Sequence, residues 1–251
     1  MTDNLAHVRE RIGLAASRAG RRSEEITLIA VSKTHSARKI QELYEAGVRH
    51  FGENRVQERE SKLSRLSCLS ATWHMIGRVQ KNKAGRSAGL FDSVDTVDSL
   101  ALAEKLDRAK EEFSAAELMK GEDQKMTNDG PGSFAAANRL RVLIEVKLDP
   151  QPAKSGAEEK ELPRLVKAIV RMPHLELRGL MSVPPYFDDP EETRPYFRRL
   201  RELRDALCAE FGTELLPVLS MGMSNDFEIA IEEGATEVRV GTALFGERES
   251  T

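Results

Sequence analysis

The chain has 251 residues, a length that fits one α/β barrel or two small domains. Apolar residues make up 40% and charged residues 31%, the composition of a soluble globular protein with ample core material. The 38 lysines and arginines nearly balance the 41 aspartates and glutamates, and the net charge is -3. This balance excludes the broad basic field that dominates nucleic-acid binding, so we expect no DNA or RNA partner.

The cysteines and the amino terminus indicate where the protein resides. Cys68 and Cys208 lie far apart and outside any C-x-x-C pattern. We therefore expect no disulfide framework and no metal site, whether built on cysteine or on other residues. The segment from Met1 to Arg11 is polar and carries both charge signs, unlike a signal peptide. No apolar run approaches the roughly 20 residues of a membrane-spanning helix. We expect a cytoplasmic monomer without membrane contact.

Short strand-like runs alternate along the chain with longer stretches in which apolar residues recur three and four positions apart. The expected strands are Ile26–Val31, Val48–Phe51, Thr72–Ile76, Phe91–Val94, Leu140–Leu148, Leu175–Val183, Pro217–Leu219 and Glu237–Val240. Strands separated by helices imply parallel pairing through crossover helices, and eight such units close naturally into a barrel. The sequence therefore predicts an α/β fold, a (β/α)8 TIM-type barrel, with an open doubly wound sheet as the alternative.

Two segments depart from this alternation. Apolar residues at helical spacing near the amino terminus predict an extra helix before the first strand: Leu5, Val8, Ile12 and Ala15. The stretch from Glu111 to Asn138 is polar and contains a Gly-Pro-Gly sequence, so we expect a mobile insertion before the fifth strand, in its simplest form a disordered surface loop. Since no linker and no internal repeat is evident, we expect a single domain over residues 1–251.

The first expected strand leads to a candidate reactive lysine. Ile26–Val31 runs directly into Ser32, Lys33 and Thr34, and functional groups of such barrels cluster at the carboxyl ends of the strands. There the lysine stem lies among apolar groups, and desolvation lowers the pKa of the amine, as a Schiff-base lysine requires. A lysine that simply reaches solvent is the alternative interpretation of Lys33.

The ends of the last two strands carry groups suited to an anion. The seventh strand leads into SMGMSND, which begins at Ser220 and holds Ser224 and Asn225, both good helix N-cap residues. The eighth strand ends in Gly241 and Thr242, which offer backbone N–H groups and a hydroxyl. Barrel enzymes often bind phosphate at these two loops. The pattern predicts a phosphate site, although ordinary turn and capping chemistry explains either segment alone.

Arg239 is the third candidate. It lies between two valines in the eighth strand, where its neighbours point to the opposite face, so its guanidinium is expected inside the barrel. An unpaired buried charge is very costly, and the arginine therefore needs a partner. Two partners remain open: the pyridine nitrogen of a cofactor, or a barrel carboxylate such as Glu53 or Glu145.

Four long segments carry a resemblance to a known family. They read AVSKTHSARKIQELYEAGVRHFGENRVQE, WHMIGRVQKNK, RGLMSVPPYFDDPEETRPYFRRLRELRD and SMGMSNDFEIAIEEGATEVRVGTALFGER. Together they resemble the pyridoxal-phosphate homeostasis proteins, a family similar to the N-terminal barrel domain of alanine racemase. The likeness runs over essentially the whole chain outside Glu111–Asn138. It implies a barrel that binds pyridoxal 5′-phosphate (PLP) and has no second domain.

The resemblance also implies roles for individual residues. The lysine of AVSK is Lys33, which would bind PLP covalently through a Schiff base. The serines of SMGMS are Ser220 and Ser224, and the GT of VRVGT is Gly241 and Thr242. In the family these positions hold the phosphate, so we expect the same of this chain.

Three further positions are carried over, and two features depart from the pattern. Arg239 in VRVG would face the pyridine nitrogen, and Asn54 in GEN would lie near the ring or the phosphate. His74 in WHMIG belongs to a family motif, but we assign it no chemistry and expect a local hydrogen bond. Lys147 stands where the family usually has asparagine, which puts any contact there in doubt. The Glu111–Asn138 stretch is the second departure.

The resemblance leaves open whether the chain is an enzyme. An arginine against the pyridine nitrogen disfavours protonation of the ring, and racemases add a tyrosine from a second domain. The tyrosines here are Tyr44, Tyr186 and Tyr196, of which Tyr186 alone is expected near the barrel mouth. We assign no catalytic residue and predict a non-enzymatic PLP carrier or reservoir, with PLP-dependent apo-enzymes as recipients. The alternatives are an amino-acid racemase with weak or conditional activity and a PLP-responsive interaction protein.

Overall fold

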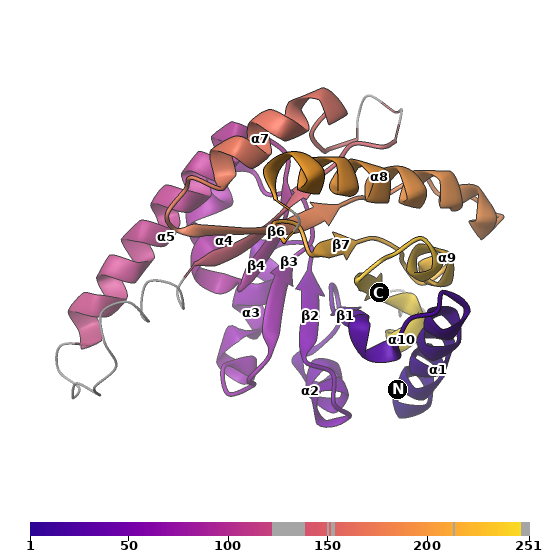
Figure 1. The fold of residues 1–251 in the computed structure, drawn as a ribbon. Helices are drawn as coiled ribbons and strands as arrows, with labels where there is room; N and C mark the ends of the chain where they lie inside the picture. Colours follow the sequence, from indigo (N-terminus) through magenta and orange to yellow (C-terminus); the bar gives the residue numbers. More distant parts are fainter. Residues whose placement is uncertain (122–138, 150, 152–153, 213, 247–251) are drawn as a thin grey trace.

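Eight parallel strands form a closed barrel in the computed structural model, which describes residues 1–121, 139–149, 151, 154–212 and 214–246 (Figure 1). The strands are β1 (Thr27–Val31), β2 (His50–Glu53), β3 (Thr72–Met75), β4 (Ser93–Val97), β5 (Leu140–Glu145), β6 (Leu175–Met181), β7 (Val218–Ser220) and β8 (Glu237–Val240). Each strand pairs with the next, and β8 pairs with β1. The predicted barrel is confirmed, and the open sheet is excluded because no edge remains between β8 and β1.

Helices surround the barrel (Figure 1). They are α1 (Thr2–Arg18), α2 (Ala37–Glu45), α3 (Val56–Leu66), α4 (Ala84–Leu90), α5 (Leu100–Gly121), α7 (Leu162–Ile169), α8 (Arg194–Phe211), α9 (Phe227–Glu232) and α10 (Thr242–Phe245), with short 3-10 turns at Ser23–Glu25, Lys81–Lys83, Glu159–Glu161 and Pro190–Thr193. Within the described ranges no helix is long and apolar enough to cross a membrane.

The apolar core lies between the strands and the helices, and the helical periodicity of the sequence explains it. The predicted stripe of α7 is buried along its whole length: Leu162, Leu165, Val166 and Ile169. The strands are buried on both faces, and all five residues of β4 are buried, as expected for parallel strands covered by helices. Three of those five residues are polar, namely Ser93, Asp95 and Thr96, so the buried environment of this strand is partly polar.

The second strand lies further along the chain than the sequence predicts. We expect Val48–Phe51, whereas β2 spans His50–Glu53 and includes Gly52. A Cβ at Gly52 would come within 2.8 Å of Ile76 Cδ1, so the barrel interior has no room for a larger side chain at that position. Because glycine and glutamate disfavour strands in isolation, tertiary packing rather than local propensity sets this boundary.

The extra helix at the amino terminus is confirmed. Leu5, Val8 and Ile12 are buried along one face of α1, which packs against α9 and α10 at the far end of the chain (Figure 1). Arg11 Nε donates to Glu228 Oε1 at 2.6 Å, which adds an ion pair to this contact. The helix therefore joins the two ends of the sequence beside the last strand.

The expectation of a loop over Glu111–Asn138 is wrong for its first part. Helix α5 continues to Gly121, because alanine, glutamate, leucine and methionine in this stretch are strong helix formers despite its polarity. Phe113 packs closely on the backbone of Gly89 in α4, where an added Cβ would lie 2.4 Å from the phenylalanine ring. The remainder of the predicted insertion, 122–138, lies outside the described residues.

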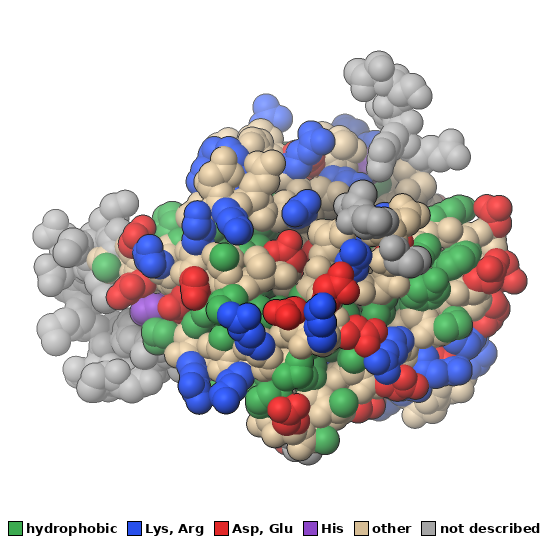
Figure 2. Space-filling view, turned by 90° about the horizontal axis from the view of Figure 1, so that it is seen from above, with side chains coloured by type: hydrophobic (Ala, Val, Ile, Leu, Met, Phe, Trp, Pro, Cys, Tyr) green, Lys and Arg blue, Asp and Glu red, His purple; other side chains and the backbone are tan. Residues whose placement is uncertain are grey.

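Charges of both signs are interspersed on the surface seen in Figure 2, where lysine and arginine side chains lie among aspartate and glutamate side chains. Opposite charges also pair below the surface, where the buried Glu233 carboxylate forms ion pairs with Arg194, Arg198 and Arg201. This face carries no extended region of a single charge, in keeping with the nearly balanced composition.

Candidate functional site

The backbone on either side of Lys33 is fixed by side chains of β2 and α3. Lys62 Nζ donates to the carbonyl oxygen of Ser32 at 3.0 Å and to Glu53 Oε1 at 2.7 Å. Ser32 Oγ donates to the same carboxylate oxygen at 2.8 Å. We call Ser32, Glu53 and Lys62 the Lys33 clamp, and all three are buried.

A further hydrogen bond holds the backbone on the other side of Lys33. Thr34 has a φ of 66°, a left-handed conformation that is uncommon for a residue other than glycine. Its N–H donates to Glu58 Oε2 at 3.0 Å, which helps to hold that conformation. Burial raises the pKa of the Glu53 carboxyl, and the nearby Lys62 ammonium opposes this shift. Lys33 itself is partly buried and follows directly after the end of β1.

The barrel register brings the end of β1 beside the end of β8. Ala30 pairs with Val240, so Val31 lies level with Gly241, and a Cβ at Gly241 would lie 3.4 Å from Val31 Cβ. The loops that follow the two strands also meet, because the rings of His35 and Phe245 stack with centroids 4.2 Å apart. Lys33 and the Gly241 turn therefore belong to one end of the barrel, and sequence reasoning missed the stacked rings.

Ser224 links the loop after β7 to the turn after β8. Its Oγ accepts the N–H of Gly241 at 3.3 Å and the N–H of Ala243 at 3.4 Å. We call Ser224, Gly241 and Ala243 the Ser224 junction. Thr242, within the same turn, is exposed. The structure thus brings the predicted phosphate-binding segments together, while their role in binding stays a prediction.

The predicted N-cap of the helix after β7 is wrong. Helix α9 begins at Phe227 with Asp226 as its N-cap, rather than Ser224 or Asn225. The Asp226 carboxylate accepts the N–H of Met223 at 2.6 Å and closes the loop on itself, which leaves the Ser224 hydroxyl for the Ser224 junction. Gly222 has a φ of +92°, and a Cβ there would lie 2.6 Å from Ala230 Cβ, so the tight turn requires glycine.

Arg239 points into the barrel, as its place in the strand predicts. It is 4% exposed, and its guanidinium donates to Ser220 Oγ and to the carbonyl oxygen of Ser182, both at 2.8 Å. The predicted carboxylate partners are wrong as direct contacts, since Glu53 is bound by the Lys33 clamp and Glu145 Oε1 accepts from Ser155 Oγ at 2.9 Å. A cofactor nitrogen as the partner of Arg239 stays a prediction.

The structure also places two other positions that the family resemblance singled out, Asn54 and Lys147. Asn54 follows β2 directly and is partly buried, and the loop after β3 packs so closely on it that a Cβ at Gly77 would lie 2.2 Å from the Asn54 carbonyl oxygen. Lys147, the departure from the family pattern, directs its Nζ to Glu158 Oε1 at 3.4 Å. Lys147 therefore pairs with a glutamate eleven positions further along the chain.

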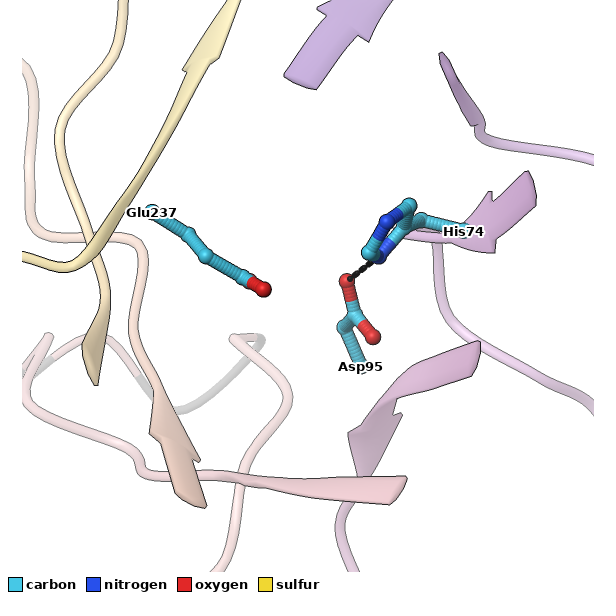
Figure 3. Close-up of side chains that lie close together, drawn as sticks. All are labelled: His74, Asp95 and Glu237. Carbon is cyan, nitrogen blue, oxygen red and sulfur yellow. Dashed lines mark hydrogen bonds and ion pairs between the residues drawn. The ribbon is translucent and has the colours of Figure 1, made fainter. Parts of the chain in front are cut away.

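His74 makes the local hydrogen bonds that we expect of it, and Figure 3 shows it facing two carboxylates inside the barrel. Its Nδ1 lies 3.0 Å from Asp95 Oδ2, and its Nε2 lies 3.0 Å from His50 Nδ1. Burial acts to lower the pKa of His74, but Asp95 and neighbouring carboxylates turn the net shift upward. Burial and the charge of His74 lower the pKa of His50 to about 4. His74 is thus hydrogen-bonded at both ring nitrogens, to Asp95 on one side and to His50 on the other.

The three tyrosines differ in exposure and in their ring contacts. Tyr186 is 79% exposed. The Arg49 guanidinium lies over the Tyr44 ring at 4.3 Å, and the Tyr196 ring lies 5.7 Å from that of Phe187. Two of the three tyrosines are therefore engaged in ring contacts, and the third is open to solvent.

Comparisons with known proteins give one consistent result. The family model described as alanine racemase, N-terminal domain, matches residues 4–249. The chain is 40% identical over 247 residues to the pyridoxal phosphate homeostasis protein of Aquifex aeolicus, covering 98% of each. It is 40% identical over 253 residues to the protein of that name from Escherichia coli, covering 98% of this chain and 96% of that one.

Solved structures agree with this result. The structure of PipY from Synechococcus elongatus without PLP has a TM-score of 0.80 and 36% identity, covering 98% of this chain and 100% of that one. PipY with PLP bound has a TM-score of 0.75 and 37% identity, covering 95% of this chain and 100% of that one. Both likenesses extend over the whole barrel rather than one segment.

Proposed function

This chain belongs to the family of the alanine racemase N-terminal domain, and on that basis we propose that it binds PLP and acts in PLP homeostasis as a non-enzymatic carrier or reservoir. The observation that carries the proposal is the 40% identity to pyridoxal phosphate homeostasis proteins over nearly the full length of both chains. PipY, 37% identical, has been solved with PLP bound in the same fold.

The residues at the barrel mouth fit this cofactor. When bound, PLP supplies an aldehyde that bonds covalently to an amine and a ring whose electronic state depends on the partner of its nitrogen. In our proposal Lys33 provides the amine, because the Lys33 clamp fixes the backbone that carries it. Arg239 is the partner of the ring nitrogen, since it is buried and its guanidinium donates to a hydroxyl and a carbonyl oxygen rather than to a carboxylate.

In this proposal the phosphate group of PLP binds at the Ser224 junction. The N–H groups of Gly241 and Ala243 point at the Ser224 hydroxyl over long distances of 3.3 and 3.4 Å, and Thr242 offers an exposed hydroxyl beside them. Backbone N–H groups and hydroxyls in such a turn are suited to phosphate oxygens. Asn54 and Ser220 contribute less directly, the first beside the mouth and the second through its bond to Arg239.

The non-enzymatic part of the proposal rests on what surrounds the mouth. A cationic guanidinium cannot accept a proton from a ring nitrogen, so Arg239 holds that nitrogen unprotonated and weakens the ring as an electron sink. Of the tyrosines that could serve as a second acid or base, Tyr44 and Tyr196 are engaged in ring contacts with Arg49 and Phe187. The shared fold with alanine racemase favours racemase activity as the second candidate function.

Covalent attachment at Lys33 is the first test. The full-length protein is loaded with PLP, its absorption spectrum is recorded, and the adduct is reduced with borohydride and mapped by peptide analysis. The label is expected on Lys33, and Lys33→Ala should lose the band of the bound cofactor. Lys83→Ala, which alters a partly buried lysine elsewhere, serves as the control and should keep it. A label on Lys81, Lys83 or Lys147 would show that the assignment is wrong.

Two assays then separate carrier from enzyme. The wild-type protein should show no turnover with alanine, serine or other common amino acids, because in our proposal Arg239 weakens the ring as an electron sink and no residue serves as a second acid or base. Robust racemisation would overturn the non-enzymatic reading while leaving PLP binding intact. Mixing the loaded protein with a PLP-dependent apo-enzyme should restore that enzyme's activity, and the absence of restoration above the level given by free PLP would argue against a carrier.

A further inference from the structure

Three side chains from three strands meet inside the barrel (Figure 3). They are His74 of β3, Asp95 of β4 and Glu237 of β8, and we call them the barrel cluster. Each offers one ligand atom, and these atoms all lie within 4.8 Å of one another. The residues come from positions that none of the PLP-binding proposals uses, so the barrel cluster is a separate feature of the chain.

Burial and hydrogen bonding set the barrel cluster apart from a chance grouping of surface carboxylates. His74 is 4% exposed and Asp95 is fully buried. Asp95 is already oriented, because Ser93 Oγ donates to its Oδ1 at 2.5 Å and its Oδ2 faces His74 Nδ1 at 3.0 Å. Glu237 is partly exposed as a residue, but its Oε2 is buried and has no hydrogen-bond partner. A buried carboxylate oxygen without a partner is costly, so a missing ligand is a physical explanation.

The fixed charges nearby do not supply the missing partner. Arg239 lies two residues from Glu237 in β8, yet its guanidinium donates to Ser220 and Ser182, and it makes no ion pair within 4.0 Å with Glu237 or Asp95. The ligand atoms of Asp95 and Glu237 therefore lie within 4.8 Å of each other, and His74 is hydrogen-bonded to Asp95.

We propose that His74, Asp95 and Glu237 bind a single divalent transition-metal cation, with Zn²⁺ as the best-suited ion. An imidazole nitrogen and two carboxylate oxygens are ordinary zinc ligands, and three protein ligands leave a fourth position open. The cation takes the place of the proton that His74 Nδ1 otherwise shares with Asp95, and that proton is released to solvent. Mg²⁺ is disfavoured, because it prefers oxygen ligands and keeps its waters.

The surroundings of His74 support this assignment. When Nδ1 binds a cation, Nε2 keeps its proton and donates it to His50 Nδ1, 3.0 Å away. A metal-bound histidine almost always donates its other ring N–H to a partner that fixes its orientation, and His50 supplies that partner. Ser93 plays the same part for Asp95. The ligands are thus held in place by a second layer of hydrogen bonds.

The test measures metal binding directly, without reference to PLP. The full-length protein, purified without a polyhistidine tag, stripped of PLP and treated with chelator, is titrated with Co²⁺ by visible absorption and with Zn²⁺ by calorimetry. We expect about one Zn²⁺ per chain, a Co²⁺ spectrum of low coordination number, and no binding of Mg²⁺ under the same conditions. Glu237→Gln and His74→Ala should each weaken Zn²⁺ by at least about tenfold, since even outer-shell changes have effects of this size.

The controls address other zinc ligands and the fold. His7→Ala and Cys68→Ser remove an exposed imidazole and an exposed thiol, and both should bind Zn²⁺ as the wild type does. If His74→Ala fails to fold, Glu237→Gln carries the test, because it keeps the shape of the side chain, and Zn²⁺ should raise the melting temperature of the wild type but not of this variant. Zn²⁺ binding that Cys68→Ser abolishes, or that Glu237→Gln leaves unchanged, would overturn the proposal, as would no binding at all.

Discussion

The two sides of the barrel mouth are held together in different ways. Beside Lys33, the clamp joins a buried lysine to a buried glutamate and a backbone carbonyl through bonds of 2.7 and 3.0 Å. At the Ser224 junction, one neutral hydroxyl accepts two N–H groups at 3.3 and 3.4 Å, next to the exposed Thr242. Short hydrogen bonds to ionised groups are roughly twice as strong as neutral ones, so the first side is far more tightly fixed than the second.

This difference suits a protein that holds a ligand and later releases it. The Lys33 clamp fixes the backbone that carries the amine, which limits the directions that the Lys33 side chain can take. The long bonds of the Ser224 junction can be exchanged for bonds to another acceptor at small cost, because each contributes little to stability. In the proposed function, a rigid attachment point at Lys33 beside an exchangeable anion site at the Ser224 junction would suit a carrier.

The largest expected effect comes from breaking the Lys33 clamp with Lys62→Met. Glu53 is fully buried, and this change removes the ammonium group that balances the negative charge of its carboxylate. Loss of one partner of a buried ion pair typically costs about 3–5 kcal/mol, and we expect the lower end because Glu53 can take up a proton instead. Urea unfolding at neutral pH measures the change in the free energy of unfolding.

Lys105→Met provides the matched control for Lys62→Met. Lys105 is an exposed lysine of helix α5, so its loss should change the free energy of unfolding by less than about 0.5 kcal/mol. The double variant Lys62→Met with Glu53→Gln should recover part of the loss, since no buried carboxylate then remains unpaired. If Lys62→Met were as stable as Lys105→Met, the contacts of Lys62 in the Lys33 clamp would contribute little to the free energy of unfolding.

The next effect concerns the Ser224 junction and appears in binding rather than stability. Ser224→Ala combined with Thr242→Ala should reduce PLP affinity by about a hundredfold or more, because each charge-assisted hydrogen bond is worth roughly 1.5–3 kcal/mol. The free energy of unfolding should change far less, as the bonds to Gly241 and Ala243 are long. Equilibrium dialysis against PLP gives the affinity, and pyridoxal without phosphate should bind the wild type poorly.

Asn225→Ala is the control for the Ser224 junction, since Asn225 is an exposed neighbour of Ser224 in the same loop. It should retain PLP as the wild type does. Unchanged PLP affinity in the Ser224 and Thr242 double variant would move the phosphate to another part of the molecule.

The contrast between the two sides also separates what the sequence can predict from what it cannot. Lys33, Ser224 and Gly241 can be found because each follows a strand-like run, and the carboxyl ends of parallel strands meet at one end of a barrel. Lys62 cannot be found in this way. It lies in a polar stretch of α3, and only the packing of that helix on β1 and β2 turns it toward Ser32 and Glu53.

The barrel cluster illustrates the same limit. The barrel cluster is spread over three strands far apart in sequence, and no short motif links His74, Asp95 and Glu237. The number and spacing of the cysteines and the local sequence patterns therefore predict no metal site. The error in α5 has a different cause. Polarity alone indicated a loop before Asn138, whereas the intrinsic helix propensity of the residues up to Gly121 decided the structure.

The smallest expected effect sharpens the picture of the clamp through its dependence on pH. Burial raises the pKa of Glu53 above its usual value of 4.5, with Lys62 opposing the shift. In the folded state Glu53 therefore binds its proton more readily than in the unfolded state. Its contribution to stability is fully present below pH 4.5 and is lost as pH rises through the folded-state pKa. Glu53→Gln cannot titrate and should lack this decline.

Urea unfolding of the wild type and of Glu53→Gln, repeated from pH 4.5 to neutrality, gives the two slopes to compare. The absolute stability of the variant will be lower, because Lys62 then stays buried beside a neutral amide, but the slope depends only on the missing titration. Glu104→Gln, which alters an exposed glutamate of α5, should follow the wild-type profile. Identical slopes for wild type and Glu53→Gln would mean that the pKa of Glu53 is the same in the folded and unfolded chains, and that the Lys62 ammonium fully offsets the burial of the carboxylate.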